Sequence, residues 1–125
     1  MKMFRLSALL ALSLGGLSLA NEYGQWGVYV YSDRSCEHQL GQWRDDQLEE
    51  CISLDGYPDA LGVRTDIKNL GPVKCGWDVL TFDNPTCDGV GREIRLNDVC
   101  VDTPFFGDFK KPVKSFTVGK FPLCD

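Results

Sequence analysis

The sequence predicts an all-β domain built from two antiparallel sheets packed face to face. Residues 26–31 and 77–82 both alternate their side chains with the two-residue period of a half-buried strand. Each segment runs into a turn of small and polar residues that ends at a cysteine, Cys36 or Cys87. Short strands, frequent turns and few segments of helical period favour an all-β fold.

These two segments are copies of one unit. The differences 77 − 26, 82 − 31 and 87 − 36 all equal 51, so aromatic residues and cysteines recur in constant register. Each half closes on a basic, β-branched stretch, starting at Val63 in the first half and at Val113 in the second. We therefore expect two similar motifs, residues 24–71 and 74–122, that cover each other's apolar faces.

Residues 1–20 have the pattern of a secretory signal peptide. Lys2 and Arg5 precede the apolar run LSALLALSLGGL, and the small residues Ser18 and Ala20 flank Leu19 before the expected cut. The run is short for a membrane span, which needs about 20 apolar residues, and no later segment is apolar enough. We expect one secreted domain, residues 21–125, of 125 − 20 = 105 residues.

The cysteines of that domain predict disulfides. An even number of cysteines in a small exported chain is typical of a disulfide framework, here of three bonds. No two cysteines have the spacing of a metal site, and the single histidine is His38. The sequence therefore predicts no zinc site and no catalytic thiol. The six cysteines are Cys36, Cys51, Cys75, Cys87, Cys100 and Cys124.

Charge and motif content exclude several function classes. The chain has 13 Lys and Arg against 18 Asp and Glu, and loss of Lys2 and Arg5 leaves 11 against 18, a net charge of −7. An acidic domain is not expected to bind nucleic acid or anionic lipid. His38 has no partner carboxylate or nucleophile at a readable spacing, so we expect no catalytic site, no enzyme activity and no cofactor.

The turns resemble those of the βγ-crystallin family. Its first hairpin has an aromatic residue, four residues, a second aromatic, one residue and a glycine. Phe82 and Gly89 match the first and last positions, with Cys87 at the second aromatic position; Tyr31 and Cys36 match in the first half. The resemblance implies eight strands in two four-stranded antiparallel sheets, in which each Greek-key motif lends its third strand to the other sheet. IKNL from Ile67 and VKSFTV from Val113 resemble the last strand of each motif.

The resemblance also bears on His38 and on calcium. His38 stands at the glycine position of the first turn, so we expect it to adopt a left-handed backbone rather than to act as a ligand. Many family members bind calcium through acidic and hydroxyl side chains before the last strand. In the corresponding residues 110–115, Lys110 and Lys111 stand where the acidic pair should be, and residues 64–69 lack the acidic opening pair. We therefore expect no calcium site in either half.

Three phenylalanines lie together in the segment TPFFGDF. Three phenylalanines, Phe105, Phe106 and Phe109, are more than a turn of this length requires, and two interpretations stay open. The segment folds over the end of the sandwich as a plug, or it forms an exposed contact patch.

Repetition limits the disulfide pairing. If the halves fold alike, Cys36 corresponds to Cys87 and Cys51 to Cys100, so both copies should follow one rule. The rule is either within motifs (36 with 51, 87 with 100) or between motifs (36 with 100 and 51 with 87, or 36 with 87 and 51 with 100). We favour pairing within motifs, since each bond closes a short loop worth about 3 kcal/mol. Each rule leaves Cys75 with Cys124, which the family fold places on neighbouring strands.

The resemblance implies functions without catalysis. Secreted two-motif members include yeast killer toxins, bacterial inhibitors of metalloproteases and small secreted proteins of fungi. We expect a monomeric extracellular effector or antimicrobial protein that contacts an unknown extracellular protein or cell-surface target. The alternatives are a protease inhibitor that presents a rigid loop, and a structural component of a spore coat or wall.

Overall fold

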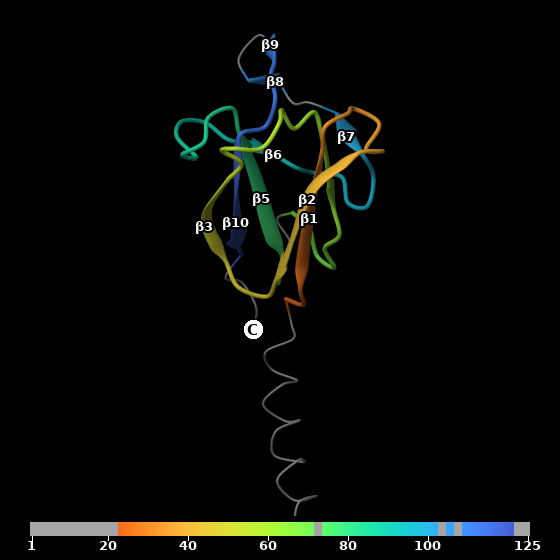
Figure 1. Ribbon diagram of the computed structural model, residues 1–125. Coiled ribbons are helices and arrows are strands. Elements are labelled where there is room, and N and C mark those ends of the chain that lie inside the picture. Colours follow the sequence, from red (N-terminus) through yellow and green to blue (C-terminus); the bar gives the residue numbers. More distant parts are fainter. Residues whose placement is uncertain (1–22, 72–73, 103–104, 107–108, 122–125) are drawn as a thin grey trace, which may run out of the picture.

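A computed structural model describes residues 23–71, 74–102, 105–106 and 109–121 (Figure 1). In this part of the chain there are strands and turns, and no helix that could span a membrane. The expected signal peptide, residues 1–20, lies outside the described residues. The strands are β1 Trp26–Tyr31, β2 Gln39–Asp45, β3 Glu49–Ser53, β4 Gly62–Thr65, β5 Trp77–Phe82, β6 Arg92–Glu93, β7 Val101–Asp102, β8 Phe105–Phe106, β9 Phe109–Lys110 and β10 Ser115–Lys120.

Eight of these strands form two four-stranded antiparallel sheets, which confirms the predicted all-β class and the two antiparallel sheets. The orders are β2-β1-β4-β7 and β3-β10-β5-β6, and a separate hairpin pairs β8 with β9. Each sheet therefore contains three strands of one half and the third strand of the other half. Figure 1 shows the two sheets face to face, with the β8–β9 hairpin beyond their ends.

The two alternating segments form β1 and β5 with the predicted bounds. Their inward residues lie in the core between the sheets, where Trp26 and Trp77 are 1% and 0% exposed. Each buried indole N–H still has an acceptor: Trp26 donates to the carbonyl of Gln47 at 2.7 Å and Trp77 to that of Tyr23 at 3.2 Å. Burial of these large side chains therefore leaves neither indole hydrogen-bond donor without an acceptor.

The prediction for the last strand of the first half was wrong. IKNL was expected to form it, but β4 is Gly62–Thr65, and Ile67 is buried just beyond its end. The register explains the difference, because Tyr31 pairs with Gly62 and Val28 with Thr65. With this correction, the residues of the first half that the resemblance aligns with residues 110–115 become 57–62, YPDALG, which also lack an acidic opening pair.

Two disulfides, Cys36–Cys100 and Cys51–Cys87, join the halves. The preference for pairing within motifs was wrong, and one of the two between-motif rules holds. The strand exchange is the reason. Cys51 lies on β3, which sits in the sheet of the second half beside β10, so it meets the turn of that half and not its own.

The predicted bond between Cys75 and Cys124 is not decided, because Cys124 lies outside the described residues. No described cysteine is free.

Candidate interaction surface

Equivalent side chains organise the two turns that carry cysteines. In the first turn, the carboxylate of Asp33 accepts from Ser35 Oγ at 2.7 Å and from the amide of His38 at 2.8 Å. In the second, Asn84 Oδ1 accepts from the amides of Thr86 and Asp88 at 3.1 and 3.0 Å. Asp33 and Asn84 are 51 residues apart, so the repeat extends to the groups that hold each turn closed.

The left-handed backbone of these turns lies at the cysteines. Cys36 has φ 57° and Cys87 has φ 56°, and Gly89 has φ 84°. His38 is not among the described residues with positive φ, so the expectation of a left-handed histidine was wrong. In the first turn the amide of His38 instead donates to the carboxylate of Asp33.

Asp33, Glu37 and His38 bring ligand atoms within 4.8 Å of one another. The hydroxyl of Ser35, opposed by desolvation and aided by the amides of Glu37 and His38, lowers the pKa of Asp33 to about 2. Its oxygens thus already serve the turn, and Glu37 and His38 are exposed. The cluster is a structural feature of the turn.

The motif aromatics Tyr31 and Phe82 are each 5% exposed. Both lie on the outer faces of their sheets by alternation, so other parts of the chain cover them. A Cβ atom on Gly91 would meet the Phe82 ring at 2.8 Å. The absence of a side chain at Gly91 therefore allows the connection between β5 and β6 to rest on this ring.

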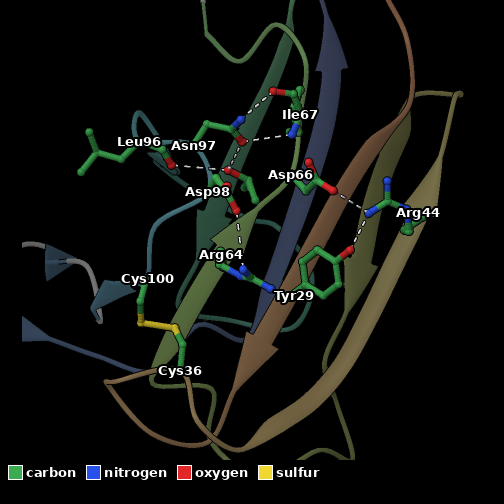
Figure 2. Close-up of polar contacts among 11 residues, drawn as sticks. Tyr29, Cys36, Arg44, Arg64, Asp66, Ile67, Leu96, Asn97, Asp98 and Cys100 are labelled. Carbon is green, nitrogen blue, oxygen red and sulfur yellow. Dashed lines mark hydrogen bonds and ion pairs between the residues drawn. A yellow bond between two sulfur atoms is a disulfide. The ribbon is translucent and has the colours of Figure 1, made fainter.

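A cluster of aromatic and charged side chains lies on the outer face of the first sheet (Figure 2). The guanidinium of Arg44, on β2, donates to the hydroxyl of Tyr29, on β1, and pairs with Asp66 at 3.0 Å. The guanidinium of Arg64, on β4, lies 5.2 Å from the centre of the Tyr29 ring. We call Tyr29, Arg44 and Arg64 the tyrosine–arginine cluster.

Hydrogen bonds and ion pairs with neighbouring residues hold the side chains of Arg44 and Arg64 in place. The hydrogen bond to Asp66, followed by that to Tyr29, raises the pKa of Arg44. A hydrogen bond to Tyr31 is the main cause that raises the pKa of Arg64, which also pairs with Asp98 at 3.5 Å. Both guanidinium groups thus stay charged while about 40% of each side chain is exposed (40% and 41%).

The second half completes this surface. Asn97 accepts from the amide of Ile67 at 3.0 Å and donates to its carbonyl at 2.7 Å, which docks the connection between β6 and β7 on the first half. Asp98 follows with φ 58°, and its amide binds the carbonyl of Thr65 at 2.8 Å. This strained residue places its carboxylate beside Arg64, as Figure 2 shows.

The phenylalanine segment contributes a hairpin, in which Phe106 pairs with Phe109 and Phe105 with Lys110. The Phe109 side chain is 69% exposed. The side chains of Phe105 and Phe106 lie outside the description, so the choice between plug and contact patch stays a prediction.

Lysines stand at positions 110, 111 and 114, in the segment where the resemblance to βγ-crystallins would place a calcium site. Lys110 pairs with Asp102 at 3.1 Å, Lys111 with Asp83 at 3.5 Å and Lys114 with Asp59 at 2.7 Å. Each of these ammonium groups is thus paired with a carboxylate. These pairs join the segment before β10 to other parts of the chain.

Sequence reasoning missed the tyrosine–arginine cluster. Its members lie on three strands, and no local motif marks them; the outward position of Tyr29 in an alternating strand was the only signal. Comparison with protein-family models, curated proteins and solved structures found no match to this chain.

Proposed function

We propose that the mature chain is a secreted, non-catalytic binding module of βγ-crystallin-like, double Greek-key architecture that acts by surface contact on an extracellular target. As an effector or antimicrobial protein it would present a fixed surface to a partner. The observation that carries this proposal is the tyrosine–arginine cluster, held in place on a scaffold cross-linked between its halves.

The strand order supports the architecture. Each sheet receives the third strand of the other half, which is the exchange that the family resemblance implies. The burial of Tyr31 and Phe82 agrees with their place at the first aromatic position of the family motif. Disulfides persist in oxidising compartments, so Cys36–Cys100 and Cys51–Cys87 support export.

The chemistry of the cluster supports a binding role. Tyrosine and arginine dominate the residues that contribute most to protein interfaces. A side chain that is ordered before binding loses less conformational entropy in the complex. Tyr29, Arg44 and Arg64 already hold one another, so a partner would not need to order them.

Growth inhibition of test microbes by the purified mature protein tests the effector function. We expect inhibition by the wild type and at least a tenfold higher effective concentration for Arg64→Ala. Arg95→Ala is the matched control: Arg95 occupies the position of Arg44 in the second half, is 81% exposed and lies outside the cluster. Equal potency of all three proteins would show that the cluster is not the contact surface.

A second candidate, inhibition of an extracellular metalloprotease, is favoured by one exposed loop. Val90 is 88% exposed in the connection that Cys51–Cys87 anchors, so it could enter a substrate cleft at little entropic cost. In this case the wild type would inhibit a metalloprotease, Val90→Asp would not, and growth inhibition would be absent. Recovery of the protein from the wall fraction, and not from the culture fluid, would favour the structural alternative.

A further inference from the structure

Two carboxyl groups share the outer face of the second sheet. Glu93, on β6, pairs in register with Leu80, on β5, and Asp78 is two residues before Leu80 on the same face. This register brings the two carboxyl groups close enough to share a proton in a hydrogen bond. One oxygen of Asp78, Oδ1, is buried and has no hydrogen-bond partner among the described residues.

The surroundings give Asp78 little compensation for a negative charge. Its partner on β10 is Gly119, which has no side chain. Lys120 lies on the other face, with its ammonium 5.0 Å and 5.2 Å from the ring centres of Tyr23 and Trp77. Arg95 is the cation that acts on Asp78, but it is largely exposed and pairs with Glu93 at 3.1 Å.

A hydrogen bond between two carboxyl groups requires a proton on one of them. Desolvation by burial, followed by the hydrogen bond to Glu93 and its negative charge, raises the pKa of Asp78 to about 7, against a smaller opposite effect of Arg95. The pair therefore carries one proton in acid and loses it near neutrality.

The first half has no such pair. The 51-residue offset places Gly27 at the position of Asp78 and Gln42 at that of Glu93. A Cβ atom on Gly27 would lie 2.7 Å from Nη1 of Arg44, so the arginine fills the space that the Asp78 side chain takes in the second half. The two halves differ here in charge while sharing the strand pairing, and the first half serves as an internal control.

We propose that Asp78 and Glu93 form a proton-operated latch, which holds β6 against β5 in acid and loosens it when both carboxyl groups are ionised. β6 is only two residues long. Its attachment includes the amide of Ile94 bound to the carbonyl of Val79 at 2.9 Å and Thr81 Oγ1 bound to the carbonyl of Arg92 at 3.0 Å. Repulsion between two adjacent carboxylates acts directly on this short edge strand.

The sign follows from the raised pKa. A carboxyl group with a higher pKa in the folded state contributes its full stability below the unfolded value, 3.8, and loses that contribution as the pH rises to about 7. The Cys51–Cys87 disulfide keeps the turn before β6 attached throughout. The loosening is therefore local to β6 and the residues next to it.

Amide hydrogen exchange of the wild-type protein tests the latch, with protection factors that divide out the intrinsic effect of pH. We expect the protection of Ile94 to fall at least tenfold between pH 5 and pH 8, and that of Trp43, its equivalent on β2, to stay constant. Asp78→Asn and Glu93→Gln should remove the pH dependence at Ile94. Glu50→Gln, an exposed carboxylate on β3 of the same sheet, should keep it.

Carboxyl ¹³C titration by NMR gives a readout that needs no variant. We expect Asp78 to titrate with a midpoint near pH 7. A midpoint below pH 5, constant protection of Ile94, or a pH dependence that persists in Asp78→Asn would each overturn the proposal.

Discussion

Gly62 and Ser115 occupy equivalent places, since Tyr31 pairs with Gly62 and Phe82 with Ser115. In the second half the Ser115 hydroxyl donates to the carbonyl of Asn84 at 2.6 Å and accepts from the amide of Cys87 at 3.1 Å. In the first half the turn approaches too closely for any side chain. One backbone position thus binds the turn through a hydroxyl in one copy and through direct backbone packing in the other.

Gly62→Ala should destabilise the domain by about 1–3 kcal/mol, because the added carbon overpacks a closed site. That Cβ atom would lie 2.6 Å from the carbonyl oxygen of Asp33 and 2.9 Å from Cys36 Sγ. Urea unfolding measures the change. Gly119→Ala is the control on the equivalent strand of the other half, where the nearest atom is 4.0 Å away. Equal stability of the two variants would contradict this account of Gly62.

Asp33 should make the first turn sensitive to acid. Its pKa is lowered to about 2 in the folded state, so its contribution to stability is present above the unfolded value, 3.8, and is lost as the pH falls from about 4 to about 2. Asp33→Asn keeps the acceptor for the amides and takes the residue found at position 84. In thermal unfolding we expect this variant to lose less of its melting temperature than the wild type over that pH range; identical losses would show that Asp33 has no such role.

At the scale of elements, a disulfide ties each turn to the other half, one at Cys51 on β3 and one at Cys100 directly before β7. Replacing both Cys36 and Cys100 by alanine should remove about 4 kcal/mol of stability, because the chain-entropy model gives this value for a loop of the observed separation, 64 residues. Denaturant unfolding of the double variant measures the loss. Non-reducing peptide mapping of the wild type is the check on pairing, and a peptide that joins Cys36 to Cys51 would refute the arrangement.

The sequence predicted the long strands better than the short ones. Six alternating residues define β1 and β5, because one face of each enters the core. β6, β7, β8 and β9 have two residues each, which is too few to show a period. The last strand of the first half was predicted too far along the chain. Val63, Thr65 and Ile67 are all buried, so burial alone does not mark the residue at which strand pairing stops.

For the whole molecule, we expect folding stability to be independent of calcium. A micromolar site in millimolar calcium would add about 4 kcal/mol. Lys110, Lys111 and Lys114 lie where the resemblance to βγ-crystallins would place a site in the second half, and they are paired with carboxylates. Melting curves with millimolar CaCl₂ and with a chelator should therefore coincide, with MgCl₂ as the control for ionic strength. A rise of several degrees in calcium alone would contradict this prediction.

The amino-acid sequence alone predicted the all-β class, the two-fold repeat with its 51-residue register, and the equivalence of Cys36 with Cys87 and of Cys51 with Cys100. These features are local or repeated along the chain, so they can be read from it. The pairing of the cysteines, the tyrosine–arginine cluster and the Asp78–Glu93 pair could be recognised only in the folded chain. The exchange of third strands sets the cysteine pairing, because it brings each turn next to a segment of the other half. The register of β1 with β2 and β4, and of β5 with β6, brings the members of the two side-chain groups together, and no local pattern in the sequence records that register.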